Sequence, residues 1–405
     1  MIGRFSLYGF LKNQKYYEPF LLLVFLEKGF SFFQIGLLIA FRELAVTVME
    51  IPSGALADSH GRRLCMAGSM AGYIVSFVVF WLSSSFLLLF IAMFFFAIGD
   101  AFRTGTHKAM IFKWLENQGR LSEKTKIYGV TRSWSKTGTA LSSIIAAALV
   151  WRSGSFSTVF LFCIPPYLIN LVNLITYPGN LEGEEHGGKT LRDSIVMMKS
   201  SVVEAVKFKP LRNLMTETMG FQGMHKVTGD YIQPVIKTMA LSIPILAALQ
   251  GDKGSAALAG GVYFVLAVLG IFGSRFSHRL VSAAGGERES ASVLWLVNFV
   301  CYAAMIPMLA AKWYIGVIAV FIVLELLQNL WRPMQVSRFD RVSPGKRRAT
   351  VLSIESQAKS ISAMIYAPVL GLLVDKFGLW VLGAFGAVVA GAVMASRSRV
   401  PEPMR

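Results

Sequence analysis

The amino-acid sequence predicts an all-α polytopic membrane protein, built from two pseudo-symmetric six-helix bundles around a central cavity. The first observation behind this fold class is composition. The 405 residues are 54% hydrophobic and 16% charged, with a mean hydropathy of +0.55, which is more apolar than a soluble globular protein. The second is a series of twelve apolar segments, each near the roughly 20 residues that a helix needs to cross a bilayer. The third is a weak repeat of sequence patterns between the two halves of the chain.

The expected spans follow one another with short polar separators such as Glu27-Lys28-Gly29. In chain order they are 6–27, 31–53, 64–83, 86–112, 126–150, 156–177, 215–242, 256–276, 291–311, 313–333, 349–373 and 378–396. One long charged connection, 178–214, divides an N-terminal bundle at 1–177 from a C-terminal bundle at 215–405. Within this cytoplasmic linker, residues 191–208 are expected to form an amphipathic helix on the membrane surface.

Arginine and lysine gather in alternate loops, which predicts the orientation of the protein in the membrane. The basic loops and the tail contain Arg62, Arg63, Lys113, Arg120, Lys124, Lys189, Arg192, Lys199, Arg275, Arg279, Arg288, Arg338, Arg341, Lys346, Arg347, Arg348, Arg397 and Arg399. The opposite loops contain little beyond Lys28, Arg152, Lys253, Lys312 and Lys376. Because basic loops stay in the cytoplasm, we expect a multi-pass protein of the cytoplasmic membrane with both termini in the cytoplasm. The same distribution explains the net charge of +17 without a nucleic-acid partner.

The residue patterns that mark enzymes and metalloproteins do not occur in the sequence. It contains no phosphate-binding loop, nucleophile elbow, paired-carboxylate motif or metal-ligand cluster. The three cysteines, Cys65, Cys163 and Cys301, lie within or at the ends of apolar segments, where we expect buried free thiols. The sequence therefore predicts neither an enzyme nor a primary pump, and it predicts no cofactor and no metal.

Charged residues inside the expected spans follow a period of three. The third, sixth, ninth and twelfth spans have no charge in their interiors, and the eighth is charged only at its cytoplasmic end. The remaining spans carry two or more charges each. An ionic group near the centre of a bilayer is costly unless it faces protein or water. We therefore expect the four apolar spans to face lipid and the others to surround a central aqueous cleft.

Depth in the membrane selects the candidate solute-binding residues. Counting about 1.5 Å per residue from the cytoplasmic helix ends places Lys15, Lys136, Asp230 and Lys359 close to mid-membrane. Arg132 and Glu355 lie one turn nearer the cytoplasm, and Arg103 belongs to the cytoplasmic third. With Glu18, the candidates are Lys15, Glu18, Arg103, Arg132, Lys136, Asp230, Glu355 and Lys359. Cations outnumber acids among them in the first half, and lysine and arginine suit carboxylate and phosphate groups. An anionic or zwitterionic organic solute is the favoured interpretation.

Proton coupling needs a buried carboxylate whose pKa responds to the solute. Asp230, Glu18, Glu43 and Asp100 are the candidates for this role. Glu43 follows Arg42 directly but points elsewhere on the helix, which leaves its partner open.

Several of these charges also have a purely structural explanation, because acids and bases three or four residues apart form ion pairs within a helix. The pairs in question are Asp100–Arg103, Lys226–Asp230 and Glu355–Lys359. Lys15 and Lys136 lack an acid four residues away, which favours contact with the solute or a bridge between the halves. Glu18 lies only three residues from Lys15, so a local pair remains open there.

The repeat between the halves consists of short matches in the same order along the chain. Lys15-Tyr16-Tyr17-Glu18-Pro19 resembles Asp230-Tyr231-Ile232-Gln233-Pro234, and Asp100-Ala101-Phe102-Arg103 resembles Asn329-Leu330-Trp331-Arg332. Arg132 and Lys136 correspond in the same way to Glu355 and Lys359. Such a repeat is typical of transporters built by duplication of a six-helix half.

The loop after the second span carries the most specific pattern, GALADSHGRR at 54–63. It supplies Gly54, Asp58, Gly61, Arg62 and Arg63. We expect its glycines to allow close approach of the backbone and its arginines to stay on the cytoplasmic side. The spacing resembles the loop between helices 2 and 3 in the major facilitator superfamily (MFS) of secondary transporters. Together with the twelve spans, the long central loop and the two-half repeat, this resemblance covers essentially the whole chain.

Resemblance to that family implies alternating access, in which two halves rock about a site near the membrane midplane. It also implies that Asp58 locks the outward-facing state through helix 11, while Arg62 and Arg63 brace the cytoplasmic side. A degraded copy of the loop begins at Gly273 and has Ser277 at the aspartate position, which does not support a second symmetric lock. The helix 5 signature of drug/proton antiporters is missing from the sequence.

The predicted function is secondary active transport of a small organic solute, coupled to protons or another ion, by a monomer in the lipid bilayer. One alternative is an efflux permease for cationic or amphipathic compounds. Another is a membrane scaffold or sensor that transports nothing. A lipid translocator of the same fold is a third, favoured if the cleft opens sideways to the bilayer.

Overall fold

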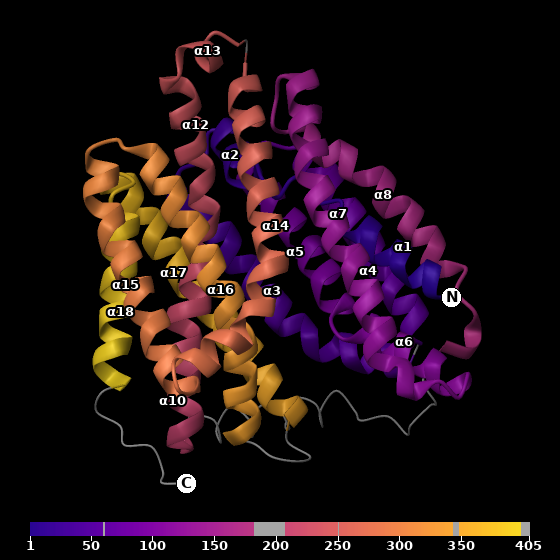
Figure 1. Cartoon of the computed structure of the whole chain (residues 1–405). Helices are drawn as coiled ribbons and strands as arrows, with labels where there is room; N and C mark the ends of the chain where they lie inside the picture. Colours follow the sequence, from indigo (N-terminus) through magenta and orange to yellow (C-terminus); the bar gives the residue numbers. More distant parts are fainter. Residues whose placement is uncertain (60, 182–206, 250, 343–347, 398–405) are drawn as a thin grey trace. The chain divides into compact units, whose positions relative to one another are not determined.

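The structure is a computed structural model that describes the chain apart from residues 60, 182–206, 250, 343–347 and 398–405 (Figure 1). Every regular element in that described part is a helix. Eight of the helices there are long and apolar enough to cross a membrane. The all-α polytopic fold predicted from the sequence is thus confirmed. The amphipathic helix expected at 191–208 lies almost wholly outside the described residues.

The helices have the following bounds. In the first half they are α1 (Ile2–Lys12), α2 (Leu21–Glu27), α3 (Phe32–Ser59), α4 (Arg62–Leu82), α5 (Phe86–Arg103), α6 (Thr106–Asn117), η1 (Leu121–Glu123), α7 (Lys124–Ser153), α8 (Thr158–Ile175) and η2 (Gly179–Leu181). In the second half they are α10 (Lys209–Thr218), η3 (Met219–Gly223), α11 (Met224–Thr228), η4 (Gly229–Tyr231), α12 (Ile232–Ser242), α13 (Pro244–Ala247), α14 (Lys253–Ala283), α15 (Glu287–Ala310), α16 (Tyr314–Val342), α17 (Arg348–Phe377) and α18 (Val381–Arg397).

Three expected spans are interrupted rather than continuous, which corrects the helices predicted at 6–27, 86–112 and 215–242. The simplest interruption separates α5 from α6 at Thr104 and Gly105. Gly105 has φ +79, in the left-handed region that glycine adopts without steric strain. The chain therefore leaves α5 and starts α6 in a new direction at this glycine.

The interruption of the first span covers residues 13–20, between α1 and α2. The side-chain amide of Asn13 donates to the carbonyl oxygen of Gly9 at 2.6 Å, and that of Gln14 donates to a carbonyl one turn back at 3.2 Å. Side chains that bind the carbonyls of a last turn compete with continuation of the helix. Pro19 also has no N–H with which to rejoin a helical ladder. The break therefore depends on polar residues as well as on the proline.

The seventh expected span is deformed twice, by the π-helical turn η3 (Met219–Gly223) and the 3-10 turn η4 (Gly229–Tyr231). A Cβ atom on Gly223 would overlap the hydroxyl group of Ser362 in α17. Glycine is therefore required where the deformed segment meets α17. Asp230, one of the candidate site residues, lies within η4.

The contacts divide the chain into two compact units, of which the first contains Met1–Lys28, Phe41–Val196 and Pro244–Ala267. Within it, α4 packs against α5 and α8, and α1 packs against α7 and α8. A Cβ atom on Gly138 of α7 would lie 2.7 Å from the carbonyl oxygen of Phe10, so α1 and α7 approach as closely as backbones can. Aromatic rings in mutual contact fill the interior of this unit, including Phe77, Phe80, Phe96 and Phe160.

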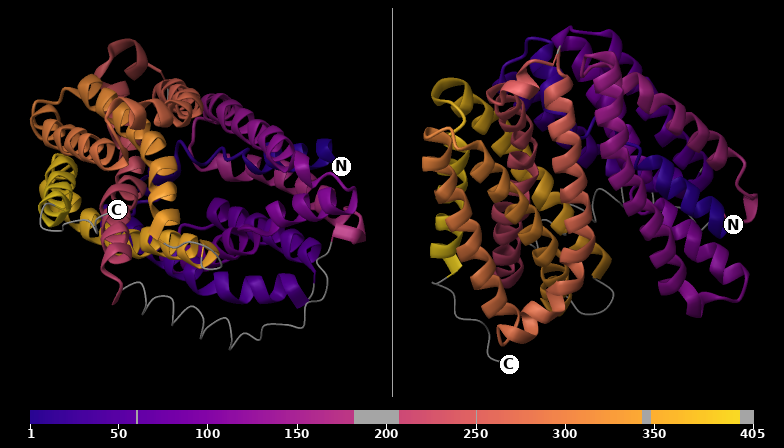
Figure 2. Two further views of the ribbon diagram at one scale, coloured as in Figure 1. Left: turned by 60° about the horizontal axis from the view of Figure 1, so that its bottom comes forward. Right: turned by 45° about the horizontal axis from the view of Figure 1, so that its top comes forward.

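The second unit contains Gly29–Ala40, Met197–Ile243 and Val268–Arg405. In it α15 packs against α16 and α18, and the pairing of the orange α15 with the yellow α18 can be followed in Figures 1 and 2. The start of α3 is capped from α17, because the carboxylate of Asp375 accepts hydrogen bonds from the backbone N–H groups of Phe32 and Phe33 at 3.0 and 2.8 Å. A carboxylate at this position satisfies N–H groups that have no acceptor within their own helix.

Two glycines one turn apart in α4 provide a matched test of the packing. A Cβ atom on Gly72 would lie 2.9 Å from the carbonyl oxygen of Phe95 in α5, whereas the nearest atom to one on Gly68 is a side-chain carbon of Phe102 at 3.7 Å. We expect Gly72→Ala to lower the free energy of unfolding by about 1–3 kcal/mol through overpacking. Gly68→Ala should be neutral or slightly stabilising, because alanine favours a helix.

The measurement is thermal unfolding of the two purified variants in detergent, beside the wild type. Equal melting temperatures for the two variants would contradict the close approach of α4 and α5 at Gly72.

Candidate functional site

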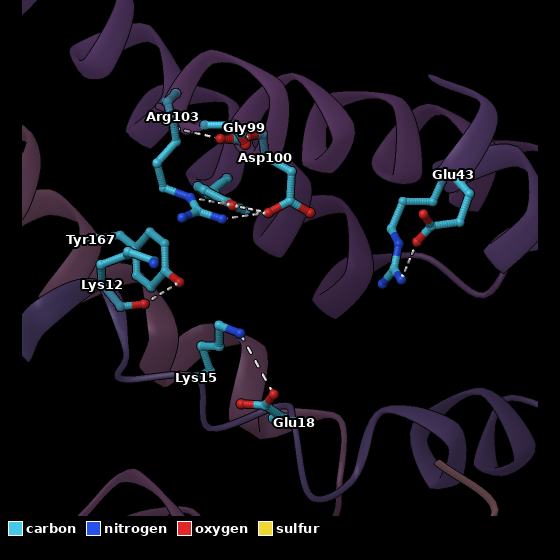
Figure 3. A network of polar contacts seen from close by, with 12 residues as sticks. Lys12, Lys15, Glu18, Glu43, Gly99, Asp100, Arg103 and Tyr167 are labelled. Atoms are coloured by element: carbon cyan, nitrogen blue, oxygen red, sulfur yellow. Dashed lines mark hydrogen bonds and ion pairs between the residues drawn. The ribbon is translucent and has the colours of Figure 1, made fainter. Parts of the chain in front are cut away.

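The interruption at 13–20 is held in place by residues of α8, within the first unit (Figure 3). The hydroxyl of Tyr167 donates to the carbonyl oxygen of Lys12, the last residue of α1, at 2.9 Å. The buried Cys163 of the same helix lies near the backbone of Tyr16 and Tyr17. Non-helical backbone at membrane depth is tolerated only where protein or a water-filled cavity satisfies it. The irregular segment is therefore a positioned element of the bundle.

The irregular segment carries the first ion pair of the site. The ammonium of Lys15 lies 3.6 Å from a carboxylate oxygen of Glu18, and the two side chains are 30% and 47% exposed. Of the alternatives left open by the sequence at Lys15, the structure has the local pair with Glu18.

The second ion pair lies in the last turn of α5 and joins Asp100 to Arg103, as their spacing predicts. The guanidinium of Arg103 donates to a carboxylate oxygen of Asp100 at 3.1 Å. The hydroxyl of Tyr73, from α4, donates to the same oxygen, and it accepts a bond from Arg103 Nε at 3.4 Å. The sequence did not point to Tyr73, because spacing along the chain cannot pair residues of different helices.

The third ion pair joins neighbours in α3. Arg42 lies 2.9 Å from a carboxylate oxygen of Glu43, whose side chain is only 4% exposed. The guanidinium of Arg42 also lies over the ring of Phe96, 5.7 Å from its centroid. The expectation that Glu43 points away from Arg42 is therefore wrong, and Arg42 is one partner of this carboxylate.

These groups interact as one set. Asp100 has Arg42 and Lys15 as charged neighbours in addition to Arg103. Lys12 has Arg103, Lys15, Asp100 and Glu18 as charged neighbours. We call this set the first charge cluster, and its members are Lys12, Lys15, Glu18, Arg42, Glu43, Asp100 and Arg103. They belong to α1, the irregular segment, α3 and α5, and most of them are labelled in Figure 3.

The two candidates of α7 stand apart from these ion pairs. Arg132 is exposed, and it has no charged partner among the residues that the structure describes. Lys136, one turn further along α7, is half-buried. Their role in solute binding stays a prediction.

The second unit holds two polar groupings of its own. Lys359 lies 3.2 Å from a carboxylate oxygen of Glu355, so these residues form the pair that their spacing predicts, and Gln222 donates to the same oxygen at 3.4 Å. The other grouping was not predicted. His225 Nε2 lies 3.0 Å from one carboxylate oxygen of Glu325, and Asn329 donates to the other at 2.8 Å.

Asp230 is half-buried in η4. Its pairing with Lys226, expected from spacing alone, stays a prediction, as does its role in proton coupling. The histidine–glutamate contact could not be found from the sequence, because it joins α11 to α16.

The motif at 54–63 is described only in part. No atom of the described neighbours lies within 4 Å of a Cβ atom built on Gly54, so the described residues make no close approach to that glycine. Gly61 has φ +90, a left-handed conformation that starts α4. Arg63 donates to the carbonyl oxygen of Tyr177 at 3.0 Å, which ties α4 to the chain leaving α8. Arg62 is half-buried, and the side chain of Asp58 is outside the described part, so their gating roles stay predictions.

Among the described residues, no three His, Cys, Asp or Glu side chains are placed to hold a metal ion. Cys65, Cys163 and Cys301 are buried and free, as predicted. A buried free thiol packs much as a small hydrophobic side chain does.

A model of the Major Facilitator Superfamily matches residues 10–365, which is most of the chain. The chain belongs to the major facilitator superfamily. It is a membrane transporter of the MFS type, and the resemblance drawn from the helix 2–3 loop and the twelve spans is confirmed.

Individual MFS proteins resemble the chain over nearly its whole length. An uncharacterized MFS-type transporter of Bacillus subtilis (strain 168), YxaM, is 21% identical over 379 residues, covering 90% of this chain and 86% of YxaM. The crystal structure of the nucleoside transporter NupG has a TM-score of 0.78 at 12% identity, covering 98% of this chain and 99% of that one. The crystal structure of a POT family transporter in complex with 5-aminolevulinic acid has a TM-score of 0.71 at 14% identity, covering 99% of this chain and 96% of that one. At these identities the two structures support the fold.

The Asp100–Arg103 pair should be energetically coupled. Its side chains are 30% and 23% exposed, so removing one partner leaves a charge in poorly solvated surroundings. We expect Asp100→Asn or Arg103→Gln to lower the free energy of unfolding by about 1–3 kcal/mol each, and the double variant to lose much less than their sum.

A double-mutant cycle by thermal unfolding measures this coupling. The control is Arg120–Glu123, which has the same three-residue spacing but lies on an exposed turn, where coupling should be several-fold smaller. Additive effects at Asp100 and Arg103 would mean that their contact contributes no coupling.

Proposed function

We propose that this MFS transporter moves a small organic solute with an anionic group, as an anion or a zwitterion, by proton-coupled alternating access. The observation that carries the proposal is the first charge cluster beside the interrupted first span. Charged groups inside a bilayer-spanning bundle mark solute or ion pathways, because they are too costly to retain as packing. Interrupted helices at binding sites are typical of secondary transporters.

The charge of the cluster supports the anionic preference. It has four cations, Lys12, Lys15, Arg42 and Arg103, against the three carboxylates that pair with three of them. Arginine and lysine recognise carboxylates by charge-assisted hydrogen bonds. One structural neighbour, the POT family transporter, was solved with 5-aminolevulinic acid, a compound with one ammonium and one carboxylate group. That precedent fits a cluster in which both signs of charge are present.

Among the carboxylates considered for proton coupling, Glu18 is the most favourable in the first unit. Its side chain is 47% exposed, against 30% for Asp100 and 4% for Glu43, so a proton reaches it most easily. Protonation of Glu18 would release Lys15 from its ion pair and change the charge presented to the solute. Asp230 remains the corresponding candidate in the second unit.

The setting of the transporter follows from the basic loops. We infer that the protein lies in the cytoplasmic membrane with both termini in the cytoplasm, because the arginines and lysines gather in one set of loops. That it acts as a monomer is a separate part of the proposal. The moving halves in this proposal are the bundles at 1–177 and 215–405.

Uptake into proteoliposomes tests the proposal. Purified protein is supplied with radiolabelled acids, zwitterions and cations of similar size, with and without a pH gradient. We expect uptake of at least one acid or zwitterion, changed several-fold by the gradient. Lys15→Gln should reduce that uptake several-fold, because it breaks the ion pair with Glu18 and removes a cation from the cluster. The exposed Lys126 of α7 provides the control variant Lys126→Gln, which should transport normally.

Other results would favour the alternatives. Uptake of cations without acids would point to an efflux permease for cationic compounds. Flux of none of the solutes, from protein shown to be folded, would favour a scaffold or sensor.

A further inference from the structure

One cation of the first charge cluster has no partner in the part of the chain that the structure describes. Three ion pairs account for the other members, namely Lys15–Glu18, Arg42–Glu43 and Arg103–Asp100. The ammonium group of Lys12 makes no hydrogen bond or ion pair with any described residue. The carbonyl oxygen of the same residue, by contrast, is bound by Tyr167. The backbone of Lys12 is therefore fixed by a hydrogen bond, while its ammonium group has no partner among the described residues.

The surroundings of Lys12 are only partly accessible to solvent and contain charges of both signs. Its side chain is half-buried at the end of α1, where the helix stops and the irregular segment begins. Its charged neighbours are the cations Arg103 and Lys15 and the carboxylates of Asp100 and Glu18. Those two carboxylates already form ion pairs with Arg103 and Lys15, so they offer Lys12 only incomplete compensation. Figure 3 shows Lys12 beside Tyr167, with both ion pairs drawn nearby.

An ammonium group held in such surroundings is destabilising for the protein alone. Partly buried charges require partners, and the two nearby cations add repulsion. An incoming anion would remove both penalties at once, because it supplies the missing partner and screens Lys12 from its neighbours. A residue that weakens the empty protein and is completed by a ligand is typical of a binding site.

We propose that Lys12 is the anchor for the anionic group of the solute, a carboxylate. This inference rests on the proposed transport function and adds the residue that decides its specificity. The ammonium of Lys12 donates hydrogen bonds to the carboxylate, and Tyr167 fixes the backbone from which Lys12 extends. The Lys15–Glu18 pair lies within electrostatic reach, so the ammonium group of a zwitterion can turn to Glu18.

Lys12 takes this role in preference to Lys15, which depth in the membrane favoured. Lys15 already has Glu18 as a partner, and a carboxylate binding there would have to compete with it. Lys12 has tyrosines, Tyr8 and Tyr16, at the positions four residues before and after it, and so no acid at helical spacing. That signal was present in the sequence.

A first test needs no solute. Lys12→Met removes the surplus charge and keeps most of the side-chain volume, so the melting temperature of the unliganded protein should rise by about 2 °C or more. Lys15→Met breaks an ion pair and should lower it, while the exposed control Lys126→Met should leave it unchanged. Destabilisation by Lys12→Met as large as that by Lys15→Met would overturn the proposal, because Lys12 would then have a structural partner.

A second test compares carboxylates with their neutral amides on the same purified proteins. The probes are 4-aminobutyrate and 4-aminobutyramide, phenylacetate and phenylacetamide, and glycylglycine and glycylglycinamide. Binding is measured by the shift in melting temperature and by competition for uptake. Wild type should prefer at least one carboxylate to its amide. Lys12→Met should lose that preference, with an affinity at least about tenfold weaker, while Lys12→Arg and Lys126→Met retain it.

The outcomes separate this inference from the proposed function. If wild type prefers a carboxylate and Lys12→Met keeps the preference, the anchor assignment fails while anion transport stands. If wild type prefers no carboxylate in either measurement, the anionic solute class fails and the anchor assignment fails with it.

Discussion

The need to satisfy polar backbone in a medium without water governs the first unit of this transporter. A spanning helix satisfies its own N–H and C=O groups, but the break at 13–20 transfers that task to neighbouring helices. Tyr167 of α8 donates to the carbonyl oxygen of Lys12, where the break begins, and Gln14 reaches the carbonyl oxygen of Gly138 in α7 at 3.4 Å. The missing side chain at Gly138 is what allows α1 to come so close to α7. The break thus determines which residues of α7 and α8 face α1.

The same break arranges the charges. In a continuous helix Lys12, Lys15 and Glu18 would follow one another along a single face at intervals of three. In the structure Lys12 ends α1, whereas Lys15 and Glu18 lie in the irregular segment. Lys15 and Glu18 pair with each other, and α5 adds Asp100 and Arg103 to the same set. After the three ion pairs have formed, Lys12 is the cation of the first charge cluster that has no ion-pair partner among the described residues. The positions of the side chains, and not the composition of the cluster, determine this.

The sequence was informative where the physics is local. Apolar length predicted the eight described helices that can cross a membrane, and three- or four-residue spacing predicted the ion pairs Asp100–Arg103 and Glu355–Lys359. It did not locate the breaks, because proline alone does not end a helix in this chain: α15, α16 and α17 each continue through one proline, and α8 continues through two. The break after Lys12 depends on Asn13 and Gln14 as well. Contacts between helices, such as that of His225 with Glu325, could not be predicted because no local sequence pattern encodes them.

The matched segments of the two halves resemble each other more in their helix interruptions than in their charged residues. The matched segments Lys15–Pro19 and Asp230–Pro234 both lie at interruptions, the first between α1 and α2 and the second at η4 and α12. If a break served only to place one particular charge, the second copy would not need it once lysine is replaced by aspartate. Deformation at both places indicates that it belongs to the repeated sequence pattern and not to one particular charge. The ionic contacts near the two deformations differ, because Lys15 pairs with Glu18 in the first unit and His225 of α11 contacts Glu325 in the second.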